Sequence, residues 1–339
     1  MTGARAVAAL YTAAISLAAA LLFLVQPMVG KMVLPRAGGS PQVWNTSLVF
    51  FQTALLLGYL YAHLSARWLG VRRQAALHLV LLALPLLVLP VVLPPGTPEA
   101  GSGPIWILAV LTSAVGAPFV VLAAASPLLQ RWLASTDHPD AADPYFLYAG
   151  SNAGSLVGLL AFPLVLEPLV PLSEQSRLWT AGYVGFAALA LLCAVVVLRS
   201  ASAATPAGGS AGPLAGPPAA ADGPAVAGAA PSARPVSGRD RLFWLAAAAV
   251  PSALLLGVTQ YLTTLIAPFS LLWALPLAVY LLTFIAAFAR RRPFSIPLLS
   301  RLLAIATVIV ALTLLARLVD PAWAVTLLHL GLLGLAALL

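Results

Sequence analysis

Charge is scarce in this sequence: only 8% of its 339 residues are Asp, Glu, Lys or Arg, whereas 62% are hydrophobic. So little polar surface cannot coat a soluble globule of this length, which excludes a water-soluble domain. Cysteine is nearly absent as well. The single Cys193 lies inside an apolar run, where we interpret it as a small packed hydrophobe, and no disulfide framework exists.

Groups that carry acid–base or metal chemistry are few and scattered. The four histidines, His63, His78, His138 and His329, show no metal-ligand spacing. Three of the nine acids fall in one Pro-rich loop, where Asp143 before Pro144 is typical of a helix N-cap. The pair Gly38-Gly39 follows no strand and indicates a turn, not a phosphate-binding loop. We therefore predict no catalytic constellation, no metal site and no cofactor.

Long apolar runs are abundant instead. A bilayer core about 30 Å thick takes about 20 apolar residues of helix to cross. Ten runs fit this length: Val7–Gly30, Val43–Ala66, Ala75–Pro94, Ile105–Ala125, Tyr145–Leu166, Trp179–Leu198, Leu242–Ile266, Leu271–Phe288, Leu298–Ala316 and Trp323–Leu339. The first run is too long for a cleavable signal peptide. The sequence predicts an all-α, polytopic helical bundle of about ten transmembrane helices whose main partner is the lipid bilayer.

The basic residues alternate between the two sides of such a bundle. Assigning successive gaps to alternate sides puts thirteen of the seventeen Lys and Arg residues on the side of the N-terminus: Arg5, Arg67, Arg72, Arg73, Arg131, Arg199, Arg234, Arg239, Arg241, Arg290, Arg291, Arg292 and Arg301. This positive-inside pattern predicts a cytoplasmic N-terminus in a bacterial cytoplasmic (inner) membrane. The net charge of +8 then reflects membrane topology, because the basic residues lie in short gaps where anionic lipid is the expected neighbour. Nucleic acid is not an expected partner.

The longest gap, residues 200–238, consists almost entirely of Ala, Gly, Pro and Ser and is too poor in large apolar side chains to fold. We predict a six-helix membrane half over residues 1–199, a disordered cytoplasmic linker over 200–238 and a second membrane half over 239–339. Two helical halves joined by a long linker are the layout of major-facilitator transporters. The arrangement here is 6 + 4, and because the sequence ends at Leu339 inside an apolar run, we expect the second half to be truncated.

The fifth apolar run carries the densest polar cluster. At helical spacing its polar side chains share one face and its glycines form a stripe beside that face: Tyr148, Ser151, Asn152 and Ser155, and Gly150, Gly154 and Gly158. Such a stripe lets another helix pack closely, and Asn in hydrocarbon needs a hydrogen-bond partner. Helix packing is the favoured interpretation, and a solute cavity lined by Tyr148 and Asn152 is the alternative.

The first apolar run ends in Gln26-Pro27-Met28-Val29-Gly30-Lys31. Pro27 removes one helical hydrogen bond and Gly30 loosens the next turn, which predicts a broken helix with carbonyls available to a ligand. Gln26, Lys31 and Asn45, at the start of the second run, are therefore candidate solute-binding residues. In the alternative interpretation Lys31 and Arg36 reach the outer headgroups and Trp44 anchors the interface.

Two further candidates lie near helix ends. Glu167 stands at the outer end of the fifth run, where it can meet Lys31, Arg36 or a cationic ligand. Acids at helix ends are usually solvated, which is the competing interpretation. Gln260 belongs to a polar island in the seventh run, Thr259–Thr264, where hydroxyls that bond back to their own helix are the ordinary explanation.

Eight blocks of the sequence together form a distinctive pattern: Leu21–Lys31, Leu34-Pro35, Gly38–Pro41, Val43–Asn45, Ala125–Trp132, Asp143–Asn152, Ser176–Trp179 and Leu271–Leu277. In these blocks the sequence resembles the membrane domain of bacterial fused major facilitator/spermidine synthase proteins. The resemblance implies a facilitator-type membrane domain that is followed, in full-length members, by a soluble aminopropyltransferase-like domain. No motif of that soluble domain occurs here, so no catalytic residue is carried over. Leu265 stands where the resemblance leads us to expect an acid.

Two functions follow as hypotheses. The first is a transporter-like module that handles a small cationic or amine solute, polyamine-like by analogy with the family. The second is a non-transporting membrane anchor or regulatory domain that serves a cytoplasmic synthase-like domain or protein. Transport predicts a wet central cavity, whereas an anchor predicts that Gln26 and Asn152 lie in dry helix contacts.

Overall fold

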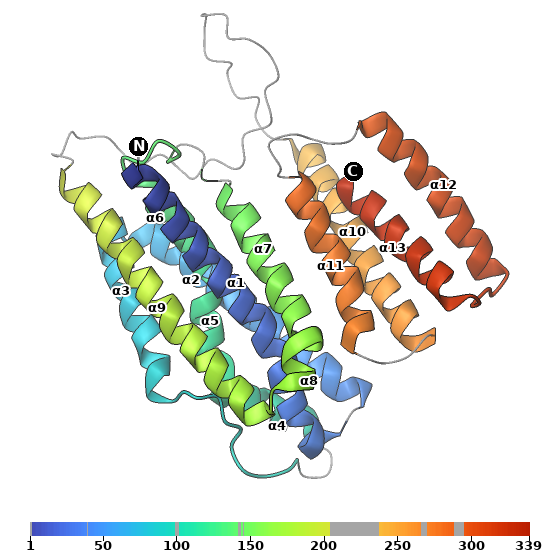
Figure 1. The fold of residues 1–339 in the computed structure, drawn as a ribbon, viewed down its shortest axis with the longest axis horizontal. Helices are drawn as coiled ribbons and strands as arrows, with labels where there is room; N and C mark the ends of the chain where they lie inside the picture. The colour runs from blue at the N-terminus through green and yellow to red at the C-terminus, as the bar shows by residue number, and fades with distance from the viewer. Residues whose placement is uncertain are drawn as a thin grey trace, which may run out of the picture.

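The structure is a computed structural model that describes residues 2–38, 40–98, 102–141, 144, 146–203, 237–265, 270–287 and 295–339. All regular secondary structure in these ranges is helical. Figure 1 shows the helices running side by side along one direction, with the two ends of the chain at the same end of the bundle. The predicted all-α class is confirmed.

The helices up to residue 203 form the larger part of the bundle. Their bounds are α1 Thr2–Ala37, α2 Pro41–Trp68, α3 Val71–Ala83 with the 3-10 turn η1 Leu84–Leu87, α4 Gly103–Leu111, the π turn η2 Thr112–Gly116, α5 Ala117–Ala123, α6 Ala125–Ala134, α7 Phe146–Ala161, the π turn η3 Phe162–Leu166, α8 Glu167–Leu169 and α9 Leu172–Ala203. The pieces α4 to α6 follow one another in a single rod, as do α7 to α8.

Four helices follow residue 237: α10 Gly238–Leu265, α11 Ser270–Ala287, α12 Ile296–Leu315 and α13 Ala322–Leu338. Ser237 and Asp240 begin α10 with reciprocal hydrogen bonds of 2.9 Å and 3.1 Å between side chain and backbone N–H. Such a capping box satisfies N–H groups that have no partner inside the helix. The second set of helices joins the first where α11 packs against α7.

Seven of the described helices are long and apolar enough to cross a bilayer. They are Gly3–Ala37, Gln42–Trp68, Gly103–Ala134, Phe146–Leu169, Leu172–Ser200, Gly238–Leu262 and Ile296–Leu315. Ala274–Ala287 and Ala322–Leu338 are shorter apolar helices. Because a helix satisfies its own backbone polar groups, bundles of this kind are suited to hydrocarbon. The protein is therefore a multi-pass membrane protein, and each of the ten predicted runs contains a helix in the described part of the chain.

Several predicted boundaries are wrong. The third run was expected to be helical to Pro94, but its helix ends with η1 at Leu87, because three further prolines follow within eight residues. The fourth helical rod continues nine residues past Ala125, to Ala134. The predicted linker over residues 204–236, the cap residue Asp143 and the arginines 290–292 lie outside the described residues.

The predicted break in the first helix is also wrong. α1 runs without interruption through Pro27 and Pro35. Proline removes only one backbone N–H, and the turn at Pro27 to Val29 is buried against neighbouring helices, which hold it helical. Gln26 donates its Nε2 back to the carbonyl of Leu22 at 3.2 Å, so its amide supports the helix instead of facing a gap.

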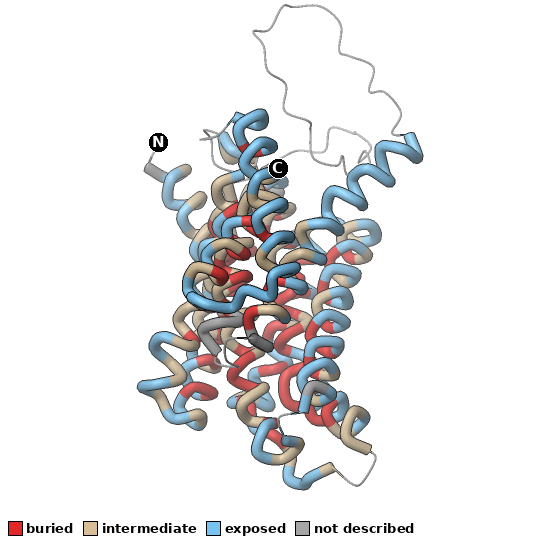
Figure 2. The backbone as a smooth tube through the Cα atoms, turned by 90° about the vertical axis from the view of Figure 1, so that its right-hand side faces the viewer, coloured by how far each residue is buried: buried red, intermediate tan, exposed pale blue. Residues whose placement is uncertain are grey.

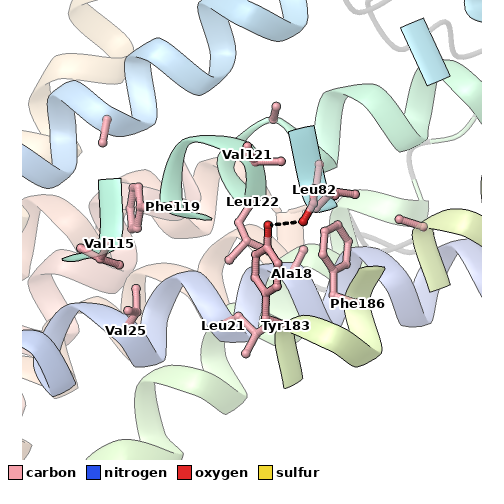
Figure 3. Close-up of a cluster of buried hydrophobic side chains, with 14 of the residues drawn as sticks. Ala18, Leu21, Val25, Leu82, Val115, Phe119, Val121, Leu122, Tyr183 and Phe186 are labelled. Carbon is pink, nitrogen blue, oxygen red and sulfur yellow. Dashed lines mark hydrogen bonds between the residues drawn. The ribbon is translucent and has the colours of Figure 1, made fainter. Parts of the chain in front are cut away.

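The main core surrounds α1. Buried residues lie along the length of the helices, with exposed residues around them (Figure 2). Figure 3 shows side chains of α1, α5 and α9 meeting in this core, and Tyr183 of α9 donating its hydroxyl to the carbonyl of Leu82 at 3.1 Å. In contrast, α10 and α12 leave most of their apolar side chains exposed. Those faces suit contact with lipid, because hydrocarbon does not penalise exposed apolar groups.

Candidate functional site

Three glycines of α7 hold that helix directly against the backbone of α1. A Cβ atom at Gly154 would overlap the carbonyl of Ser16, and one at Gly158 would lie 2.5 Å from the carbonyl oxygen of Ala20. Ser16 donates its Oγ to the carbonyl of Gly150 at 2.8 Å. The predicted small-residue stripe is therefore a close helix contact, as it is at many membrane helix interfaces.

The contact of Gly150, Gly154 and Gly158 with α1 is called the glycine seam below. The polar residues of α7 lie beside it. Tyr148 is 41% exposed, Asn152 is half-buried and Ser155 is buried. Leu159, two helical turns after Asn152 on the same face, clusters with Ala274, Ala278 and Leu281 of α11. Asn152 thus lies on the side of α7 that meets the second set of helices, and both predicted roles, helix packing and cavity lining, stay open for it.

One pair of candidate residues forms an ion pair. Lys31 near the end of α1 contacts the carboxylate of Glu167 at the start of α8, although 136 residues separate them. Their side chains remain 41% and 24% exposed. The glycine seam sets this geometry, because it fixes the two helices in a register that brings their lower ends together in Figure 1.

A small cavity of about 230 Å³ lies between α1, η3 and α9, next to this ion pair. Met28, one turn before Lys31, and Leu166, the neighbour of Glu167, both line it. The other lining side chains are almost all apolar and come from α1 and α9. Lys31 and Glu167 do not line the cavity themselves, but each lies within one helical turn of a residue that does.

Gln175 provides a polar group inside that cavity. Its Nε2 donates to the carbonyls of Leu166 at 3.1 Å and Val170 at 2.8 Å, which fixes the orientation of the amide. Its Oε1 is buried and has no hydrogen-bond partner in the part of the chain that the structure describes. This oxygen has almost no accessible surface, so Gln175 lines the cavity with other atoms and the oxygen is closed off by the packing around it. Sequence patterns did not indicate Gln175, because one amide within the polar stretch Ser173–Arg177 carries no spacing signal.

The remaining candidates lie apart from this cavity. Gln26 is half-buried and bonded to its own helix. Asn45 is exposed on α2, and Gln260 is exposed on α10. In the polar island of α10, Thr259 donates its hydroxyl to the carbonyl of Leu255 at 2.7 Å, which confirms the expected bond back to its own helix. Nearby, His329 of α13 stacks on Tyr261 with ring centroids 4.5 Å apart.

Sequence reasoning missed a buried polar network that joins α2, α3 and α6. Gln74 is fully buried, donates Nε2 to Ser65 at 3.0 Å and accepts the indole N–H of Trp132 at 3.3 Å. His78, one turn later, is also fully buried and stacks beside Tyr61. The spacing of Gln74 and His78 places them on one helix face, which was the available signal. Their bonds are structural, because they fix α3 against two neighbouring helices.

No family model matches this sequence, and no curated protein matches it. The geometry of the described residues therefore carries the functional argument. Among the described residues, the ion pair of Lys31 and Glu167 brings two candidate groups together in space, and the cavity that Gln175 lines lies close to it.

Proposed function

We propose that this multi-pass membrane protein is a transporter-like module for a small cationic or amine solute. Glu167 is the group that recognises the solute's ammonium, and Lys31 occupies that carboxylate while the solute is absent. The observation that carries the proposal is the Lys31–Glu167 ion pair, which lies within one helical turn of residues that line the apolar cavity.

The side chain of Lys31 is itself a primary ammonium on a methylene chain. Its contact with Glu167 therefore has the chemistry of the contact that a solute amine would make. Both side chains are partly exposed, and ion pairs of this kind contribute about 1 kcal/mol or less. An incoming amine thus meets a reachable carboxylate and displaces a weakly held competitor.

The cavity beside the pair suits the rest of such a solute. Its walls are almost entirely apolar, which matches a methylene chain. A polyamine-like solute has amines at intervals along a methylene chain. One of these amines meets Glu167, and the methylene chain lies along the apolar walls.

The resemblance to fused major facilitator/spermidine synthase proteins supports the same solute class. In this proposal residues 1–199 and 239–339 are the two membrane halves, and the N-terminus and the 200–238 linker face the cytoplasm of a bacterial cell. The arginine-rich side of the sequence supports that orientation.

A second candidate function is a non-transporting anchor or regulatory domain of an aminopropyltransferase-like protein. One observation favours it: the two best-formed cavities among the described residues have almost entirely apolar walls, and neither lies between α7 and α11. Neither of these two cavities is the wet central cavity that transport requires.

Reconstitution in liposomes separates the two candidates. Transport predicts saturable uptake of labelled putrescine or spermidine that unlabelled amine competes away. Glu167→Gln is expected to reduce this uptake at least tenfold, whereas Glu174→Gln, an exposed acid seven residues away, is the matched control and should keep it. Absence of saturable uptake by a folded, correctly inserted protein would overturn the transport proposal and leave the anchor.

A further inference from the structure

A second cavity, of about 430 Å³, opens between α2 and α3 at the end of the bundle that carries the N-terminus. The two helices are joined by the short turn Leu69-Gly70 but make little contact along their lengths, so a groove remains between them. Its walls are almost wholly apolar, formed by leucines 57, 60, 64 and 77 together with Trp68.

The groove faces outward, toward the surroundings of the bundle. Leu57 is 49% exposed, Leu60 is 46% exposed and Trp68 is 71% exposed. In a multi-pass membrane protein such a face contacts lipid chains, and an exposed Trp at a helix end is typical of the headgroup level. The groove therefore spans the depth from the headgroups into the hydrocarbon.

Basic side chains gather at the headgroup end of the same groove. Arg67 belongs to the last turn of α2, and Arg72 and Arg73 to the first turn of α3, and all three are exposed. Arg131 of α6 reaches across to donate to the carbonyl of Leu69, which lines the groove.

We propose that this groove is a binding site for one anionic phospholipid. An acyl chain lies along the leucines between α2 and α3, and the phosphate is held by Arg67, Arg73 and their basic neighbours. Charge complementarity at one end and an apolar channel at the other together fit an amphiphile with a negative headgroup. Basic pockets between membrane helices bind anionic lipid headgroups in this way.

The test titrates the delipidated full-length protein in detergent with phosphatidylglycerol or phosphatidylcholine and counts bound lipid by native mass spectrometry. One phosphatidylglycerol per chain is expected, bound at least tenfold more tightly than phosphatidylcholine. Arg67→Gln combined with Arg73→Gln should weaken phosphatidylglycerol about tenfold or more, because each basic residue near the surface contributes about fivefold. Arg199→Gln combined with Arg301→Gln removes the same charge from exposed positions elsewhere and should change nothing.

Two further experiments test whether the acyl chain contributes to binding. Leu60→Trp fills the groove with all arginines intact and should abolish tight binding, while excess inorganic phosphate should fail to displace the lipid. If Leu60→Trp does not fold, brominated phosphatidylglycerol should quench wild-type tryptophan fluorescence more than that of Trp68→Phe. The proposal would be overturned by equal binding of the two lipids or by an equal loss of lipid binding in the control variant. Displacement of the lipid by phosphate, or quenching that does not depend on Trp68, would overturn it as well.

Discussion

The carbonyl of Ser16 in α1 occupies the space that a side chain at position 154 of α7 would need. The hydroxyl of the same Ser16 donates to the carbonyl of Gly150, which lies one turn before Gly154 in α7, at 2.8 Å. Because backbone atoms fill the space, α1 has to shift as a whole before a Cβ fits at position 154. This contact sets how closely the helix that carries Lys31 approaches the segment that carries Glu167.

Gly154→Ala is therefore expected to destabilise the protein by roughly 1–3 kcal/mol, the usual cost of overpacking. Thermal unfolding of the detergent-solubilised protein measures the effect as a lower apparent melting temperature. Gly185→Ala is the control, because a Cβ there lies 3.8 Å from the side chain of Leu17, an ordinary contact. It should be neutral or slightly stabilising, since Ala favours a helix over Gly. An unchanged melting temperature for Gly154→Ala would contradict the close contact.

The Gln74 network gives a second prediction. Gln74→Leu leaves the indole N–H of Trp132 buried without its acceptor, which should cost about 1–3 kcal/mol of stability. Adding Trp132→Phe removes the orphaned donor, so the double variant should lose less than the sum of the two single losses. Gln52→Leu, at an exposed position of α2, should have little effect on the same unfolding measurement. Additive losses would show that the two residues do not interact.

The arginine asymmetry predicts which end of the bundle faces the cytoplasm. Cys193 is buried, so Cys193→Ala provides a background without an accessible thiol. In that background Thr97→Cys should react with a membrane-impermeant maleimide in intact spheroplasts, whereas Ser237→Cys should react only after permeabilisation. Both native side chains are exposed and lie in loops or at a helix start. The reverse labelling pattern would invert the proposed orientation.

Much of this fold is readable from the sequence, because hydrocarbon imposes a simple length and hydropathy rule on each crossing. The glycine stripe of α7 was readable too, since Gly150, Gly154 and Gly158 recur at helical spacing. The effect of the prolines on helix ends was predicted wrongly in two opposite ways. Pro27 suggested a break that packing prevents, while the run to Pro94 was predicted as helix although prolines end it at Leu87.

The candidate site was only partly predictable, for a related reason. Lys31 and Glu167 stood out as rare charges at helix ends, so their pairing was a natural expectation. Gln74 and Gln175 are single amides among the polar residues at helix starts, so neither stands out in the sequence, and the bond of Gln74 to Trp132 spans 58 residues. The burial of the Gln175 Oε1 without a hydrogen-bond donor results from the packing of several helices, so no local sequence pattern predicts it.

Opposite effects of the two partners of the ion pair distinguish a solute site from a structural bridge. If Glu167 binds the amine and Lys31 competes with it, Lys31→Gln should tighten putrescine binding several-fold, because it removes the internal ammonium that competes with the solute for this carboxylate. Glu167→Gln should weaken binding at least tenfold. A merely structural pair would make both variants shift binding in the same direction through a common loss of stability. Isothermal titration of the reconstituted protein with putrescine measures both constants, and Glu174→Gln supplies the reference for removing a nearby acid. Weaker binding in Lys31→Gln would contradict the competition between Lys31 and the solute.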